Sequence, residues 1–282
     1  MFYGVSTRNI LLNDGINPDF RFTGTSNFID FIHRTTRDSE IYFLTNRHKE
    51  NAKTTATFRI KGKPELWDPV TGMILKSPIH KIVKDGTSIE LSFEAFQSVF
   101  VVFQNIPEAE DQGNAKVFQS PNFTNMLTLA NSWEVSFDPK WGGPAKTTFN
   151  TLQDWSKSDD PKIKYYSGKA VYSQIFDTPN LEKGAKLFLD LGVVKDIASV
   201  KLNGYELGTV WTAPWRVEIT QQLKPSGNRL EIEVINQWPN RLIGDAALPE
   251  SERSTNTNIV FKQTDPLMAS GLLGPVVILR ML

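Results

Sequence analysis

The sequence predicts an all-β fold built from two tandem antiparallel β-sandwiches. Between residues 186 and 245, apolar and polar residues alternate in several short runs, which are separated by Asn203-Gly204 and by Pro225–Asn228. A period of two with tight-turn residues between the runs is typical of antiparallel strands with one face in water. Similar runs occur before residue 105, and a polar stretch from Pro107 to Gly113 interrupts the pattern. These observations predict two sandwiches joined by a linker.

The first domain is expected to span residues 1–105. A short helix is expected from Thr7 to Leu12, before the loop at Asn13-Asp14-Gly15. Strands dominate from Phe28 onward, with turns at Pro69–Gly72 and Asp85-Gly86. The strand pattern, with alternating or continuous apolar residues, occurs in four runs: residues 40–44, 55–61, 88–93 and 99–103.

The second domain is expected to span residues 123–282, after a linker at residues 106–122. Its opening section is rich in aromatic and turn residues, among them Trp133, Trp141 and Trp155. Its central section carries the alternation described above. Ser270 to Pro275 and the apolar residues that follow are expected to form a last strand that returns to the sheet.

Charge and composition exclude several classes of partner and site. The 282 residues include 31 basic and 31 acidic side chains, so neither nucleic acid nor an anionic membrane is expected as a partner. There is no cysteine, which excludes disulfides and thiolate metal sites. No apolar stretch is long enough to predict a membrane-spanning helix. The first residues lack the basic and apolar regions of a signal peptide, so the localisation stays open.

The second domain resembles the jelly-roll sugar-binding domain of many large glycoside hydrolases. The resemblance rests on residues 186–245, where an apolar strand, the Asn203-Gly204 motif, an aromatic-rich bend and an alternating strand follow one another. It implies a galactose-binding-like jelly roll, and it makes carbohydrate the first class of partner to consider.

Motifs along nearly the whole chain also resemble α-L-rhamnosidases of glycoside hydrolase family 106. Such enzymes place their acid and base carboxylates on a large barrel that would precede residue 1, and the segment before Pro18 is expected to be a short remnant of it. The resemblance therefore implies no catalytic residue in this chain. The motifs are Phe31–Arg34, Asp38–Asn46, Pro64–Gly72, Trp133–Val135, Phe137–Pro144, Tyr165–Phe176, Trp238–Asp245 and Ser270–Pro275.

Aromatic and planar polar residues near two bends are the candidate carbohydrate-binding residues. Sugars lay their apolar C–H face on aromatic rings, and planar polar groups bind their hydroxyls. The alternative is that the tryptophans close the open end of the sandwich while Arg241 and Asp245 pair as a structural clamp, because aromatic side chains are most often buried for their area. The candidates are Trp211, Trp215, Arg216, Trp238, Asn240, Arg241 and Asp245.

Hydrolysis by this chain would require two carboxyl groups roughly 5 to 10 Å apart across a sugar-sized cleft. Sequence spacing does not show that any two converge, and carboxylates on loops usually serve solvation or turns. No catalytic residue is assigned. The carboxylates considered are Glu134, Asp138, Asp154, Asp159, Asp160, Asp245 and Glu250.

No metal or cofactor is expected from the sequence. His33, His48 and His80 do not have a metal-binding spacing, and His33 is expected to hydrogen-bond locally with Arg34. Calcium is compatible with a β-sandwich sugar module, but no Asp-x-Asp-x-Asp-Gly loop supports it. Trp67 is expected to pack in the core or between domains.

Together these features predict a non-catalytic, carbohydrate-associated fragment of an α-L-rhamnosidase-like glycoside hydrolase. It would support or extend the substrate cleft of a catalytic barrel that is absent from this chain. One alternative is a free-standing carbohydrate-binding module for plant-type polysaccharide side chains. The other is a structural interaction module with an apolar patch on the first domain, which a catalytic barrel or a second copy would cover. The full-length enzymes that the chain resembles are typically exported.

Overall fold

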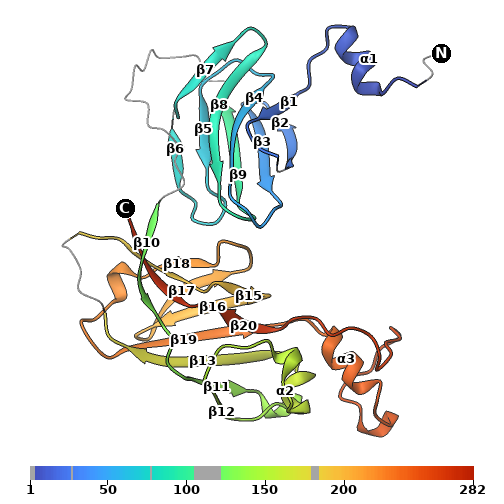
Figure 1. Ribbon diagram of the computed structural model, residues 1–282, viewed down its shortest axis with the longest axis vertical. Helices are drawn as coiled ribbons and strands as arrows, with labels where there is room; N and C mark the ends of the chain where they lie inside the picture. Colours follow the sequence, from blue (N-terminus) through green and yellow to red (C-terminus); the bar gives the residue numbers. More distant parts are fainter. Residues whose placement is uncertain (1–3, 27, 77, 105–121, 179–183) are drawn as a thin grey trace. The chain divides into compact units, whose positions relative to one another are not determined.

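A computed structural model describes residues 4–26, 28–76, 78–104, 122–178 and 184–282 (Figure 1). The chain divides into two compact units, residues 1–120 and 121–282. Antiparallel strands dominate both, which confirms the predicted all-β class. The polar stretch from Pro107 to Gly113, expected to be a linker, lies outside the described residues.

Unit 1 contains helix α1 (Thr7–Asn13) and two antiparallel sheets. The four-stranded sheet has the order β1 (Phe20–Thr23), β4 (Ala52–Phe58), β8 (Gly86–Phe93) and β7 (His80–Val83). The five-stranded sheet has the order β2 (Ile29–Thr35), β3 (Ser39–Asn46), β9 (Ser98–Gln104), β5 (Pro64–Trp67) and β6 (Ile74–Lys76).

The core of unit 1 lies between its two sheets. Alternate side chains of each strand point inward, so Tyr42, Phe58 and Val101 are fully buried. Strand β4 begins and ends three residues before the expected run, and the Arg59 N–H continues its pairing with the chain before β1 by donating to the Asp19 carbonyl. Helix α1 was expected, yet it buries none of its residues.

The expectation for His33 was wrong, and so was one of the two alternatives for Trp67. His33 does not pair with Arg34; its Nδ1 lies 2.8 Å from Asp19 Oδ2 and its Nε2 lies 2.8 Å from Glu40 Oε2. Trp67 is not part of the core, and its packing between domains stays a prediction. It lies on the outer face of the five-stranded sheet, because its neighbour Leu66 takes the inward position.

Unit 2 contains a six-stranded, a four-stranded and a two-stranded antiparallel sheet. The six-stranded order is β12 (Thr147–Phe149), β11 (Trp133–Phe137), β13 (Lys169–Phe176), β19 (Asn228–Ile235), β16 (Ile197–Leu202) and β17 (Tyr205–Val210). The four-stranded order is β10 (Phe123–Thr128), β21 (Val277–Met281), β14 (Leu187–Asp190) and β18 (Arg216–Glu218). The two-stranded sheet pairs β15 (Val193–Lys195) with β20 (Gly271–Gly274).

The predicted alternation sets the register of β16 against β19. Val200 lies opposite Ile232 and both are buried, while Lys201 lies opposite Glu231 on the other face. Asn203 and Gly204 have φ of +54° and +89°, which two-residue hairpin turns require. The expected last strand is divided in two, because β20 pairs with β15 whereas β21 pairs with β10 and β14.

Short helices fill the connections of unit 2. They are η1 (Pro139–Trp141), η2 (Trp155–Lys157), α2 (Pro161–Lys164), η3 (Thr220–Gln222), α3 (Pro239–Asp245) and η4 (Glu250–Glu252). Helix α3 was missed by the sequence patterns, although proline at a first helical position is a start signal. Among the described helices, none is long and apolar enough to cross a membrane.

Candidate functional site

The seven predicted carbohydrate-binding residues form two separate groups in unit 2. Trp211 and Trp215 lie in the β17–β18 connection, Arg216 begins β18, and the other four belong to α3 or its N-cap. Helix α3 lies well apart from β18 (Figure 1). The seven residues therefore do not converge on one site.

In the first group, Arg216 is held by other side chains. Its Nε and Nη2 donate to Asp190 Oδ2 at 3.2 and 2.9 Å, and its guanidinium lies 4.0 Å from the centre of the Phe123 ring. Trp215 is partly buried and packs on the core of unit 2. Trp211 is different, because 67% of it is exposed. Of this group, Trp211 alone offers an open ring face.

In the second group, Asn240 is a structural residue with every polar atom of its amide engaged. It is 1% exposed, and its Nδ2 donates to the Met268 carbonyl at 2.7 Å and to Ser270 Oγ at 3.0 Å. Its Oδ1 accepts from the Met268 N–H at 2.7 Å. Asn240 thus fixes the chain before β20 to helix α3.

An exposed pair of tryptophans lies beside α3. Trp238, the N-cap residue of α3, meets Trp141 edge to face with ring centres 5.2 Å apart. The two residues are 46% and 40% exposed. Arg241 ties α3 to the backbone of Trp141, because its Nη2 donates to the Trp141 carbonyl at 2.5 Å. Gly142 ends η1 with φ of +78° and turns the chain after Trp141.

Two polar atoms on α3 are buried without a hydrogen-bond partner: Arg241 Nε and Asp245 Oδ1. Asp245 is 2% exposed, and its Oδ2 accepts from both the N–H and the hydroxyl of Thr255. The expected clamp between Arg241 and Asp245 is therefore not formed; each residue pairs elsewhere. Within the described parts of the chain, no group of three or more His, Cys, Asp or Glu side chains could hold a metal ion.

Three of the carboxylates considered for hydrolysis serve local backbone structure. Asp138, Asp154 and Asp160 are N-caps whose side chains accept from backbone N–H groups two residues later. The surface beside α3 offers different chemistry. Two partly exposed indole rings and a guanidinium suit the apolar face and the hydroxyls of a pyranose.

Trp141 was not predicted as part of this surface. It lies 97 positions before Trp238 in the sequence, so only folding brings the two rings together. The available signal was the Trp141–Pro144 motif itself, whose two glycines indicate a tight turn.

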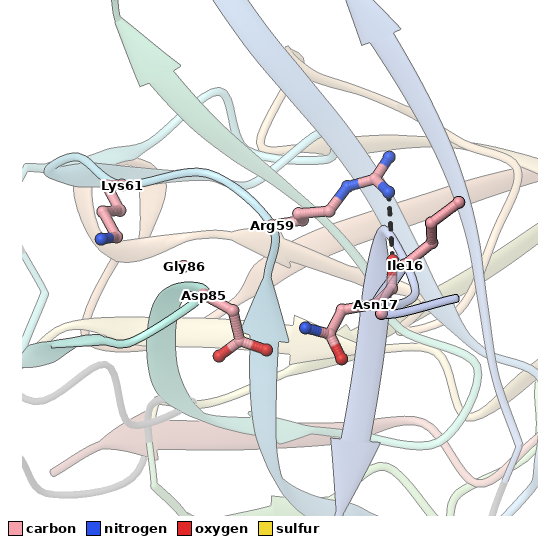
Figure 2. A pocket seen from close by; sticks show the side chains of 7 residues that line it. Ile16, Asn17, Arg59, Lys61, Asp85 and Gly86 are labelled. Atoms are coloured by element: carbon pink, nitrogen blue, oxygen red, sulfur yellow. Dashed lines mark hydrogen bonds between the residues drawn. The ribbon is translucent and has the colours of Figure 1, made fainter. Parts of the chain in front are cut away.

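Unit 1 has a surface hollow of about 480 Å³ (Figure 2). Arg59 points across it and donates to the Asn17 carbonyl at 3.0 Å. Asp85 at its wall is engaged by Arg21 through two hydrogen bonds of 2.8 and 3.1 Å. None of the seven predicted carbohydrate-binding residues lines this hollow.

The sheets of unit 2 form an antiparallel β domain of the sandwich type, preceded by another antiparallel β unit. Comparison with known families agrees. Residues 145–264 match the glycosyl hydrolase 2 galactose-binding domain-like family. Residues 1–80 match the α-L-rhamnosidase family, glycoside hydrolase family 106. The chain therefore has an α-L-rhamnosidase-like region followed by a galactose-binding-like segment, and it is related to non-catalytic domains of glycoside hydrolases.

Two individual relatives support this relationship. The solved rhamnosidase of Novosphingobium sp. PP1Y is 35% identical, with a TM-score of 0.79 over 98% of this chain. A Formosa agariphila protein that carries the name of a β-glucuronidase is 39% identical over 176 residues, or 53% of this chain. The matches cover only 26% of the rhamnosidase chain and 15% of the Formosa protein.

Proposed function

We propose that this chain is the carbohydrate-associated, non-catalytic part of an α-L-rhamnosidase-like glycoside hydrolase. Unit 2 supports or extends the substrate cleft, and it contacts glycan through Trp141, Trp238 and Arg241. The ligand class is a plant-type polysaccharide side chain. The proposal assigns no hydrolysis to the chain alone.

The observation that carries the proposal is the exposed tryptophan pair beside α3. Neighbouring exposed aromatic rings are a common feature of ligand-binding surfaces. The two rings contact each other, and Arg241 bonds to the backbone carbonyl of Trp141, so part of this surface is arranged before a ligand docks. Rigid aromatic side chains beside a guanidinium match the alternating apolar and hydroxyl faces of a sugar ring.

The test is an isothermal calorimetric titration of the purified chain with rhamnose- and galactose-terminated oligosaccharides. We expect saturable binding to one class and a loss of roughly tenfold in affinity for Trp238→Ala, equivalent to about 1.4 kcal/mol. Trp211→Ala is the matched control, because it removes an even more exposed tryptophan outside the α3 surface.

Two results would contradict the proposal. If the wild-type chain binds none of the oligosaccharides, a sugar-contacting role for unit 2 is wrong. If Trp211→Ala abolishes binding while Trp238→Ala does not, the contact lies on the β17–β18 connection instead.

A further inference from the structure

Arg241 is a cation without a carboxylate partner, and it lies beside the tryptophan pair. Its Nη2 donates to the Trp141 carbonyl, whereas its Nε is buried without a hydrogen-bond partner. Among the residues that the structure describes, none accepts a hydrogen bond from Nη1 and none forms an ion pair with this guanidinium. An arginine side chain keeps its positive charge throughout the pH range in which proteins fold. The surface beside α3 therefore carries a positive charge that the described residues do not neutralise.

Two carboxylates on the neighbouring segments serve other groups. Asp245 lies one turn after Arg241 on α3, but its Oδ2 accepts from the N–H and the hydroxyl of Thr255. Asp138 is the N-cap of η1, and its Oδ1 accepts from the Lys140 N–H at 2.9 Å. Neither carboxylate forms an ion pair with Arg241, so the guanidinium stays available to an anion from outside the chain.

The residue after Trp141 leaves the guanidinium uncovered. Gly142 has φ of +78°, and a Cβ at this position would lie 3.5 Å from Arg241 Nη2 and 3.8 Å from Nη1. Any larger residue would thus place its side chain against both terminal nitrogens. Glycine keeps this space free, which lets a ligand approach the charged end of Arg241.

A second cation without an ion pair precedes Trp141 in η1. Lys140 is exposed, and its ammonium group pairs with no carboxylate of the described chain. The outer face of the six-stranded sheet differs, since Arg229 there is paired with Glu231 at 2.9 Å. The whole chain has no net charge, so two unpaired cations around the tryptophan pair make the surface beside α3 locally positive.

We infer that the glycan bound beside α3 is an acidic one. An anionic group on the sugar, either a uronate carboxylate or a sulfate ester, pairs with Arg241 while the sugar ring stacks on Trp141 or Trp238. The terminal N–H groups of a guanidinium suit both anions, and hydrogen bonds between charged partners are stronger than neutral ones. Arg241 is thus the residue that favours acidic over neutral sugars. The inference rests on the proposed function for the presence of a glycan on this surface.

Calorimetric titration of the wild-type chain with two matched pairs of oligosaccharides tests the inference. The first pair is an oligosaccharide that ends in a uronate and the methyl ester of the same oligosaccharide, which has no charge. The second pair is one neutral oligosaccharide with and without a sulfate ester. We expect the charged member of at least one pair to bind roughly tenfold more tightly or better. Salt at about 1 M should reduce this preference several-fold, because it screens the charges.

Substitution of Arg241 by a neutral residue identifies the group that recognises the charge. Arg241→Gln should bring the ratio of the two affinities within a pair close to one. Arg229→Gln is the matched control, because it makes the same change of charge on β19, outside the surface beside α3. This control should keep the preference of the wild-type chain. The comparison of charged and neutral ligands uses the wild-type chain, so it holds even where a variant does not fold.

The outcomes separate this inference from the proposed function. Equal affinities within both pairs refute the acidic ligand and leave the sugar contact in place. A preference that persists in Arg241→Gln, or that Arg229→Gln also removes, refutes the role of Arg241. If none of the four oligosaccharides binds, the sugar contact itself is wrong and the inference fails with it.

Discussion

Replacing Asn240 by alanine separates a structural role for this residue from a role in sugar contact. The variant removes three hydrogen bonds and leaves both the N–H and the carbonyl of Met268 without this partner. Each unsatisfied buried group costs about 1–3 kcal/mol. Water compensates in part, since Met268 is 41% exposed. We therefore expect the free energy of unfolding of unit 2 to fall by about 2–3 kcal/mol.

Urea unfolding followed by tryptophan fluorescence measures this loss in the right unit. Every tryptophan except Trp67 belongs to unit 2, so the signal reports mainly that unit. Asn125→Ala is the control within unit 2, because Asn125 is exposed and its bond to Thr128 Oγ1 is long, at 3.3 Å. Its free energy of unfolding should change by less than about 0.5 kcal/mol.

Glycan titration of the folded Asn240 variant completes the experiment. Its affinity should match that of the wild-type chain, because the buried amide cannot reach a ligand. A stability loss below about 0.5 kcal/mol together with weaker glycan binding would refute the reasoning, and it would make Asn240 a sugar contact.

Three further substitutions test other parts of unit 2. Gly143→Ala should lower the free energy of unfolding by about 1–3 kcal/mol or more, since a Cβ at this position would lie 2.5 Å from Phe137 Cβ. An unchanged midpoint of thermal unfolding would contradict this close packing. Arg216→Met leaves the partly buried Asp190 without its cation, so the free energy of unfolding measured with urea should fall by about 1–3 kcal/mol. An unchanged free energy of unfolding would show that the ion pair is dispensable. Burial raises the pKa of the Tyr172 hydroxyl well above its ordinary value of 10.0. The folded state therefore holds this proton more strongly, and the stabilisation is present below about pH 10 and lost as the pH rises above it. As the pH rises from about 9 to about 11, the free energy of unfolding should fall less for Tyr172→Phe than for the wild type. Parallel curves of stability against pH would refute the raised pKa of Tyr172.

Much of the fold follows from local patterns that the sequence displays directly. The alternation around Val200 and Ile232 predicts strands with one buried face, and Asn203-Gly204 predicts the hairpin turn. Helix α3 was missed because its start signal, Pro239, lies in a segment that lacks apolar residues repeated at the helical spacing of three to four positions. The core placement considered for Trp67 was wrong, because composition does not show which face of a strand meets the core.

The candidate sites depended far more on tertiary structure. The sequence determined which strands, turns and aromatic motifs the chain has, since these depend on neighbours a few positions apart. It also carried the resemblance to glycoside hydrolases. Only folding brought Trp141 beside Trp238, and only folding set the Arg241 guanidinium against the Trp141 carbonyl. Contacts between distant segments depend on sheet order and register, which are set by how the strands bury their apolar faces together and not by any local pattern.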